Sequence, residues 1–209
     1  MKVAPEVLPP AFYLVGLNLS GRRCVVIGPR ADREAAEKVR DLREVGADVV
    51  WLDDPTALRD QDLHGAFFVI ATPLDAELAA RLRGLADRER FLLCTIDQPA
   101  FGFVALPATV KAGAARIGIS TGGTSPRAGS ILRAGLQRAL DARFARFLAC
   151  LGHQRRRARA RFPDDAAARR ATLSAAADGF EVEVAVRYPD WFNEQLRAAG
   201  PHVVESPRG

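Results

Sequence analysis

The sequence predicts an α/β fold built on a small parallel sheet, followed by a helical C-terminal part. Short apolar runs that each end at a glycine or an aspartate alternate with segments whose apolar residues recur at helical spacing. After residue 112 this alternation stops, and a long helical pattern begins at residue 126. Strands that alternate with helices pair in parallel, so we expect a ligand to bind where the carboxyl ends of the strands meet.

The first strand is expected at residues 23–27, where the run RCVVI ends at Gly28. A helix follows, because apolar residues recur at helical spacing at Ala35, Val39, Leu42 and Val45. Further strands are expected at 49–52, 67–71 and 91–96, and the helix between the last two carries Leu78, Leu82 and Leu85 on one face. This order is that of one half of a doubly wound, Rossmann-like domain.

Beyond the sheet, two short strands are expected at 104–110 and 116–120, around a turn at 111–113. A long helix is expected from Pro126 to about residue 160, because proline suits the first helical position and Ser125 can cap it. Another helix is expected at 166–177. Residues 181–187, EVEVAVR, alternate like a strand, although the flanking Ala-rich sequence favours a helix, and the tail from Ser206 is expected to fray.

The length of 209 residues fits one compact domain with a helical extension. We place boundaries near residues 112 and 147. Residues 1–112 then form the Rossmann-like domain, residues 113–147 a connecting region, and residues 148–209 a C-terminal helical domain.

Cysteine usage favours a cytoplasmic protein. Cys24, Cys94 and Cys150 lie far apart, which fits neither a disulfide framework nor a metal-binding motif and favours a reducing compartment. No apolar run is long enough to span a membrane, and the N-terminus is not typical of a secretory signal. The three histidines show no metal-ligand spacing, so no metal site is expected.

The formal net charge of +5 rests almost entirely on arginine. A compositional bias towards arginine and alanine explains this, and so does a polyanionic ligand, since guanidinium groups pair well with carboxylates and phosphates. The run RRRARAR at residues 155–161 lacks interleaved aromatic residues. We therefore interpret it as a solvated helical face and expect no nucleic-acid partner.

The loop after the first strand begins as a dinucleotide-binding loop does, with a strand, a glycine and then a helix. Gly28 is present, but the second and third glycines of that fingerprint are absent, and Pro29 cannot donate a backbone N–H. Asp32 would repel a phosphate, although it can cap the helix, and Arg30 or Arg33 can replace the lost donors with charge. A nucleotide site and a plain structural turn both remain open.

Acidic side chains follow two other strands. Asp53 and Asp54 stand where a carboxylate can accept the hydroxyls of an adenine ribose, which favours NAD over NADP, but a solvated turn before Pro55 fits equally. Asp97 follows the last strand directly and is well placed as a general base. An aspartate before Gln-Pro is also a common way to start a turn, so both interpretations of Asp97 stand.

The stretch ISTGGTSPRAG at residues 119–129 combines two glycines and four hydroxyl residues immediately before a helix. Such a segment presents backbone N–H donors to an anion, and Arg127 adds charge in the first turn. A helix cap alone is the simpler alternative, but it requires fewer glycines and hydroxyls than this stretch contains.

Taken in order, these segments resemble the precorrin-2 dehydrogenase/sirohydrochlorin ferrochelatase family, of the siroheme-synthase N-terminal type. The opening LPPAFYLVGLNLSGRRCVVIG and the segment EKVRDLREVGADVV are similar to the first strand, helix and second strand of the family. FFVIATPLDAELAARL and LLCTIDQPAFGFVALPATV resemble its later strands, and ISTGGTSPRAGSILRAGLQRAL is close to its most specific motif. The resemblance covers most of the chain.

The resemblance implies a nucleotide-binding domain, a dimerisation region at 113–147 and a C-terminal helical domain, assembled as a homodimer. It implies oxidation of precorrin-2, an octacarboxylate tetrapyrrole, to sirohydrochlorin with NAD, and in some members insertion of ferrous iron. The catalytic aspartate of the family maps to Asp97. Cofactor contacts map to Gly28, Arg33, Glu34, Asp53, Asp54 and Thr72. Substrate contacts map to Ser120, Thr121, Gly122, Gly123, Thr124, Ser125 and Arg127.

The chain departs from the family pattern mainly on the nucleotide side. The loop GPRADREAAEK is two residues longer than the family loop and lacks two of its glycines, and the segment between Asp54 and Phe67 is too short for the usual extra strand and helix. Cys94 and Ala79 stand where the family has asparagines. Two alternatives to an NAD-dependent dehydrogenase follow: a chelatase that does not use NAD, and a non-catalytic tetrapyrrole-binding protein.

Overall fold

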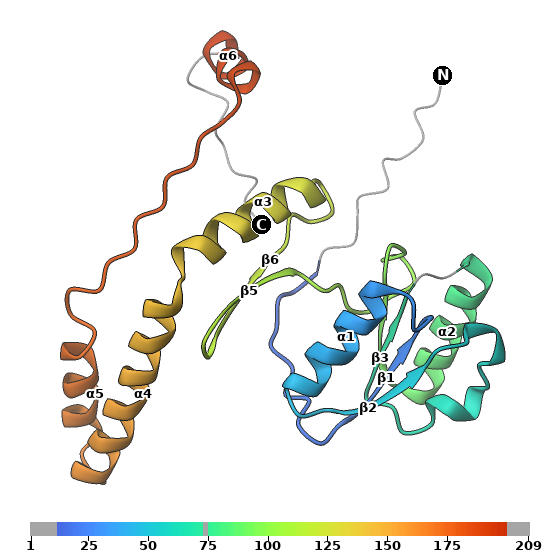
Figure 1. Cartoon of the computed structure of the whole chain (residues 1–209), viewed down its shortest axis with the longest axis horizontal. Helices are drawn as coiled ribbons and strands as arrows, with labels where there is room; N and C mark the ends of the chain where they lie inside the picture. Colours follow the sequence, from blue (N-terminus) through green and yellow to red (C-terminus); the bar gives the residue numbers. More distant parts are fainter. Residues whose placement is uncertain (1–11, 73–74, 200–209) are drawn as a thin grey trace. The chain divides into compact units, whose positions relative to one another are not determined.

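The computed structural model describes residues 12–72 and 75–199, and Figure 1 shows the order of their helices and strands. The chain divides into two compact units, residues 1–149 and residues 150–209. The first unit contains the predicted sheet domain and also residues 113–147, which the sequence analysis had set apart. The tail from Ser206 lies outside the described residues. None of the described helices is both long and apolar enough to cross a membrane.

Four parallel strands form the sheet of the first unit, as the sequence predicts. They are β1 (Arg23–Ile27), β2 (Asp48–Leu52), β3 (Phe68–Ala71) and β4 (Leu92–Thr95), in the spatial order β2-β1-β3-β4. Helices α1 (Arg33–Glu44) and α2 (Ala76–Glu89) provide two of the connections. The chain moves to one side of β1 to form β2 and returns to the other side to form β3. This reversal creates the switch point at which doubly wound sheets bind ligands.

Alternate residues of the strands feed two hydrophobic clusters. Val25, Ile27 and Val69 pack with Leu82 and Leu85 of α2 in the first cluster. The second cluster contains Cys24, Val26, Ile70 and Cys94, together with Ala35, Val39 and Leu42 of α1. The apolar residues that recur at helical spacing in the sequence are therefore the residues on the buried faces of α1 and α2. Burial raises the pKa of the Cys94 thiol to about 11, so this side chain packs as a small apolar group.

Helix α1 begins at a cap that ties it to the sheet. Asp32 is the N-cap residue, and its Oδ1 accepts the backbone N–H of Glu34 at 2.9 Å. The other oxygen of this carboxylate, Oδ2, accepts the hydroxyl of Thr72 at 2.6 Å, and Thr72 is 1% exposed. The Thr72 hydroxyl, followed by the Glu34 N–H, lowers the pKa of Asp32 below its ordinary value.

The hairpin that follows the sheet begins later than the sequence predicts. It consists of β5 (Ala108–Ala112) and β6 (Ala115–Ile119), so the predicted strand at 104–110 is wrong at its start and residues 111–112 belong to a strand rather than to a turn. The N–H groups of Phe103 and Val104 both donate to the Leu93 carbonyl, at 2.8 and 3.0 Å, which ties this stretch to β4. Pro107, which has no N–H, then separates it from the hairpin.

Side chains from two helices hold the hairpin in the first unit. The Gln137 side-chain amide forms two hydrogen bonds with the backbone of Lys111. Its oxygen accepts the Lys111 N–H at 3.1 Å, and its nitrogen donates to the Lys111 carbonyl at 2.9 Å. The Lys111 ammonium lies 2.8 Å from Asp41 Oδ1 and 3.0 Å from Glu44 Oε2. Glu44 also binds Arg116 at 2.8 Å. The turn end of the hairpin is therefore anchored at the C-terminal end of α1.

The long helix predicted at 126–160 is two helices, α3 (Pro126–Ala139) and α4 (Ala142–Arg161). The prediction is wrong at Leu140 and Asp141, because the Asp141 carboxylate accepts the N–H groups of Arg143 and Phe144 and so starts a new helix. Apolar spacing continues through the break and does not reveal it. Both helices nevertheless lie within the predicted range.

The second unit contains the C-terminal half of α4 and the helices α5 (Ala166–Ala175) and α6 (Asp190–Ala199). The predicted helix at 166–177 is confirmed, with its end two residues earlier. Residues 181–187, for which strand and helix were both open, form neither. They run as an exposed, extended segment between α5 and α6, drawn in orange-red in Figure 1.

We expect Thr72→Val to destabilise the first unit by about 1–2 kcal/mol at pH 7, because it removes a hydrogen bond to a carboxylate. The pKa of Asp32 is lower in the folded chain, so this stabilisation is present above the unfolded pKa, about 3.9, and is lost as the pH falls through the folded value. Urea unfolding followed by Trp51 fluorescence in a Trp191→Phe background measures the effect.

The matched control is Thr109→Val, whose hydroxyl donates to the neutral carbonyl of Pro107. Its effect on stability should not change between pH 7 and acid. An identical pH dependence for the two variants would show that the Asp32 contact does not contribute in the way described.

Candidate functional site

The sheet brings the polar residues predicted at its carboxyl edge to one place. Gly28 follows β1, Asp53 follows β2, Thr72 follows β3, and Asp97 lies just beyond β4. Because β1 and β3 are neighbours, Gly28 and Thr72 stand at the switch point, with Asp53 on one side and Asp97 on the other. The arrangement expected of a ligand-binding edge is therefore present.

Position 28 requires a glycine, because atoms of Thr72 and Ala35 lie very close to its backbone. A side chain there would clash with the Thr72 hydroxyl and would bring a Cβ to 2.9 Å from the Thr72 carbonyl oxygen and 3.3 Å from the Ala35 Cβ. Gly28 therefore allows α1 to pack closely on the sheet. Thr72, a predicted cofactor contact, gives its hydroxyl to Asp32 and acts in this structure as a support of the loop.

The N-terminus of α1 already holds a negative charge. A dinucleotide phosphate is normally held by the free N–H groups at this position. Here the Asp32 carboxylate accepts one of them, and Pro29 supplies none. The predicted contact Arg33 is exposed in the first turn, and Glu34 faces Lys38 along the helix at 3.6 Å. The capping role considered for Asp32 is thus confirmed. Asp32 therefore takes up a backbone N–H group that would otherwise be available to a phosphate.

Arg30, Trp51 and Asp53 form a cluster beside this loop, which we call the Arg30 cluster. The Arg30 Nε donates to Asp53 Oδ2 at 2.5 Å, and its guanidinium carbon lies 5.0 Å from the centre of the Trp51 ring. The Trp51 indole N–H donates to the Gly28 carbonyl at 2.8 Å. The Arg30 and Asp53 side chains are 66% and 48% exposed, so water screens this ion pair and it contributes little to stability.

The Asp54 side chain forms hydrogen bonds only with nearby residues of its own segment. Its Oδ1 accepts the N–H and the hydroxyl of Thr56, at 2.9 and 2.6 Å, and so caps the short 3₁₀ helix η1 (Pro55–Ala57). The Thr56 hydroxyl is the main reason that the pKa of Asp54 is lowered. A second 3₁₀ helix, η2 (Asp60–Leu63), completes the short connection to β3. Of the two predicted ribose contacts, Asp53 is therefore the one at the edge beside the loop.

Asp97 is exposed and has a left-handed backbone, with φ of 62°. Non-glycine residues seldom adopt this conformation, and those that do cluster at functional sites. The surrounding turn holds it: the Thr95 hydroxyl donates to the Gln98 carbonyl at 2.6 Å. Gly102 closes the same turn tightly, because a Cβ there would lie 3.1 Å from the Thr95 hydroxyl and 3.2 Å from the Leu93 carbonyl. The fold therefore fixes the position from which this carboxylate is presented.

The predicted substrate loop, residues 120–127, divides into two sets of groups. Three hydroxyls are used within the loop: Ser125 caps α3 by accepting the Ala128 N–H, Thr121 bonds the Ser125 backbone, and Ser120 accepts the Gly122 N–H. Gly122 and Gly123 have φ values of 60° and 79°, which only glycine adopts readily. Thr124 and Arg127 are exposed, and their side chains have no hydrogen-bond or ion-pair partner among the described residues. These two side chains are the ones available to an anion.

The loop and Asp97 are not joined directly. Across residues 12–72 and 75–199, no hydrogen bond or ion pair links residues 120–127 with Asp97 or with the Gly28 loop. The described residues also contain no group of three or more His, Cys, Asp or Glu side chains able to hold a metal ion.

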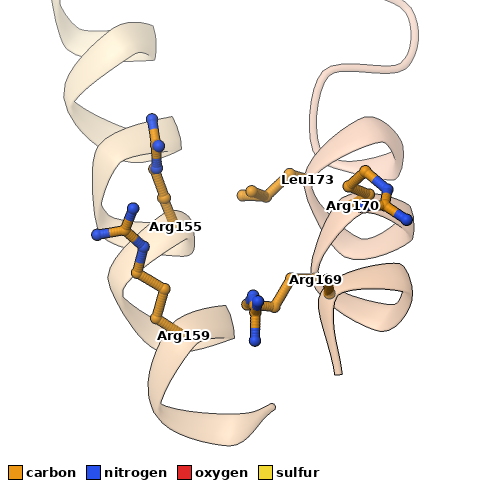
Figure 2. Close-up of a pocket in the computed structure, with 6 residues that line it drawn as sticks. Arg155, Arg159, Arg169, Arg170 and Leu173 are labelled. Atoms are coloured by element: carbon orange, nitrogen blue, oxygen red, sulfur yellow. The ribbon is translucent and has the colours of Figure 1, made fainter. Parts of the chain in front are cut away.

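A separate hollow lined by arginines lies between α4 and α5 in the helical unit, and we call it the arginine cleft (Figure 2). Its volume is about 200 Å³, and its lining consists of Arg155, Arg159, Ala166, Arg169, Arg170 and Leu173. Arg169 is held in place, because it donates to the Phe162 and Pro163 carbonyls, both at 2.5 Å. The other three guanidiniums form no ion pair with any described residue. The run 155–161 is evident in the sequence. That Arg155 and Arg159 line one hollow together with Arg169 and Arg170 of α5 is evident only in the structure.

The residues at the sheet edge fit a dinucleotide in its adenosine half and depart from one in its phosphate half. Asp53 can accept ribose hydroxyls once Arg30 leaves it, and Trp51 supplies an aromatic surface beside it. The Asp32 carboxylate occupies the N-terminus of α1, so a phosphate at this edge would need a cationic side chain, and Arg30 in the loop and Arg33 in the first turn are nearby.

Comparison with known proteins agrees with the fold and the sequence motifs. Residues 15–108 match the family described as "Putative NAD(P)-binding". The siroheme synthase of Thioalkalivibrio sulfidiphilus is 26% identical over 178 residues, covering 76% of this chain and 36% of that protein. The siroheme synthase of Ectopseudomonas mendocina is 30% identical over 149 residues, covering 71% of this chain and 30% of that protein. The chain thus spans about a third of the length of these curated relatives.

Among solved structures, SirC, a precorrin-2 dehydrogenase, matches with a TM-score of 0.65 at 18% sequence identity. The match covers 80% of this chain and 90% of that one, so the Rossmann-like domain and the helical extension share an architecture with SirC. The sheet-edge geometry, the motif at residues 119–129, the NAD(P)-binding match and the siroheme synthase relatives all agree. The chain is therefore similar in sequence to part of the siroheme synthases and similar in fold to SirC.

Proposed function

We propose that this chain oxidises precorrin-2 to sirohydrochlorin with NAD as the hydride acceptor, in the biosynthesis of siroheme. The observation that carries the proposal is the exposed Asp97 carboxylate, fixed in a left-handed turn at the carboxyl edge of an NAD(P)-binding sheet. The names of the relatives, siroheme synthase and precorrin-2 dehydrogenase, support the substrate class.

Asp97 acts as the general base. The oxidation removes a hydride and a proton from the macrocycle, and NAD, when bound, accepts the hydride. The proton needs an acceptor within reach of the substrate, and a carboxylate at the rim of the sheet meets this requirement. Ferrous iron insertion, which we include as a possible second activity, releases pyrrole protons that the same carboxylate can accept. Iron is then a substrate held by the four macrocycle nitrogens.

The carboxylates of the tetrapyrrole require cationic partners. Arg127 and the Thr124 hydroxyl provide unpaired groups at the glycine-rich loop. We include in the proposal the homodimer that the family resemblance implies, with residues 113–147 as its dimerisation region.

NAD is held through an exchange of partners at the Arg30 cluster. When Arg30 turns from Asp53 to a cofactor phosphate, the Asp53 carboxylate becomes free to accept the ribose hydroxyls. Breaking the Arg30–Asp53 pair costs about 0–1 kcal/mol, because the two side chains are 66% and 48% exposed and water screens the pair. One side-chain movement thus opens both contacts that the cofactor needs.

The second candidate function is a chelatase that does not use NAD. The Asp32 carboxylate at the N-terminus of α1 favours it, because this charge repels a phosphate at the usual position. The two candidates share Asp97 as the base and the tetrapyrrole contacts, but one oxidises the macrocycle with NAD and the other inserts a metal ion without it.

The decisive experiment is anaerobic incubation of the protein with precorrin-2, with and without NAD, followed by absorption spectroscopy. NAD-dependent formation of sirohydrochlorin is the expected result. Asp97→Asn should lower the rate by about 10²–10⁴-fold, as loss of a general base does, and should leave substrate binding intact. Asp87→Asn, an exposed carboxylate paired with Arg83 on α2, is the control and should be neutral. If Asp97→Asn retains the full rate, Asp97 is not the base.

Arg30→Met should weaken NAD binding about tenfold, because it removes the loop cation that replaces the backbone donors. Quenching of Trp51 fluorescence on NAD addition, in a Trp191→Phe background, measures binding without catalysis. Arg22→Met is the matched control, since Arg22 precedes β1 and lies over Phe67 at 5.6 Å. No binding in the parent protein supports the chelatase instead.

Arg127 gives a third prediction. Arg127→Gln should raise KM for the tetrapyrrole about tenfold and leave kcat unchanged, since this exposed arginine binds a carboxylate and does not touch the reacting atoms. Arg146→Gln, an exposed arginine of α4, is the control. An unchanged KM in Arg127→Gln would contradict the assignment of the glycine-rich loop to the substrate.

A further inference from the structure

The segment Glu181–Arg187 presents an extended, unpaired backbone to solvent. It is extended between α5 and α6, and every residue in it is exposed. Val182, Val184 and Val186 are 59%, 64% and 55% exposed. No described residue forms a hydrogen bond with the backbone of residues 181–187. The segment therefore carries both the free backbone groups and the apolar side chains of a strand without a sheet.

This composition differs from that of an ordinary linker. Linkers are rich in glycine, serine and proline, whereas β-branched residues at alternate positions are typical of strands packed on one face. The alternation gives one face of three valines and an opposite face that carries Glu181, Glu183, Ala185 and Arg187. An extended segment with a free edge and an apolar face is a template for another strand.

The segment is complementary to itself in the antiparallel direction. If two copies pair about Val184, Val182 of one copy lies opposite Val186 of the other, and Glu181 lies opposite Arg187. The apolar faces then coincide, and opposite charges meet at both ends. A parallel pairing in register would instead place Glu181 against Glu181 and Glu183 against Glu183, which is unfavourable.

We propose that residues 181–187 pair with the same segment of a second copy as an antiparallel two-stranded ribbon, with Val184 on the twofold axis. The contact is isologous, so two copies use up the segment on both chains and leave no free edge of it on that face. A two-stranded ribbon is only marginally stable in isolation. Pairing is therefore favoured when both segments are already extended, because less conformational entropy is then lost. A second copy of this chain presents the segment in this form.

This interface is separate from the dimerisation region at 113–147 that the family resemblance implies. It uses only residues of the helical unit, and its pairing follows from the order of side chains in EVEVAVR. It does not depend on the proposed enzymatic function, so the failure of either proposal leaves the other in place.

Cysteine cross-linking tests the register. In a Cys150→Ser background, which removes the exposed native thiol, Val184→Cys places two thiols directly opposite each other, where Cα atoms lie about 4.5–5.5 Å apart and a disulfide can form. Val182→Cys places its two thiols about 13 Å apart along the strands, because each faces residue 186. Mild oxidation of the full chain should give a covalent dimer at least about tenfold faster with Val184→Cys than with Val182→Cys.

The double variant Val182→Cys/Val186→Cys should restore fast cross-linking, because the two positions face each other. Equal rates for the two single variants, or no dimer with Val184→Cys, would overturn the proposal. The first of these results would indicate random collision, and the second would indicate another partner or none.

Charge exchange provides an independent test of direction. Arg187→Glu should slow the cross-linking of Val184→Cys, since it sets like charges against each other at both ends of the ribbon. Adding Glu181→Arg to Arg187→Glu should restore the rate. Failure of the double exchange to restore it would contradict the antiparallel register.

Discussion

The carboxylate of Asp32 is the constraint on which the nucleotide side of this protein depends. One of its oxygens accepts an N–H group of α1, and the other accepts the buried Thr72 hydroxyl at the end of β3. A single side chain thus starts the helix, joins it to the sheet and places a negative charge where family members are expected to bind phosphate. The absence of the later glycines follows naturally, since a loop that does not admit a phosphate to its backbone has no need of them.

In the proposed mode of NAD binding, the occupied N-terminus of α1 transfers phosphate recognition from the backbone to a side chain. Backbone N–H groups are rigid and preorganised, whereas the Arg30 guanidinium is mobile and must first leave Asp53. The exchange has a compensating advantage: the movement that supplies a cation to the phosphate also releases the acid required by the ribose. The Arg30–Trp51 contact keeps the guanidinium near the loop in either state.

Most of the sheet could be predicted from the sequence, because apolar periodicity reports which side chains are buried. The parallel order alone placed Gly28, Asp53 and Asp97 at one edge, whereas Thr72 was expected there from the family resemblance. The contacts among them could not be predicted: Asp32 and Thr72 are 40 residues apart, and nothing local indicates their pairing. The break at Asp141 was missed for a related reason, since a cap can interrupt a helix while the apolar spacing continues. The late start of β5 depends on Leu93, a residue of another strand.

The alternating segment at 181–187 shows why periodicity alone left its structure open. Period-two alternation predicts a strand only where a neighbour supplies hydrogen bonds, and the described residues of one chain supply none. A free apolar edge ordinarily invites uncontrolled aggregation, and charged residues are the usual protection. Here Glu181, Glu183 and Arg187 disfavour parallel stacking and favour a single antiparallel register about Val184. The charges that make the segment tolerable in solution are therefore the same ones that select its partner.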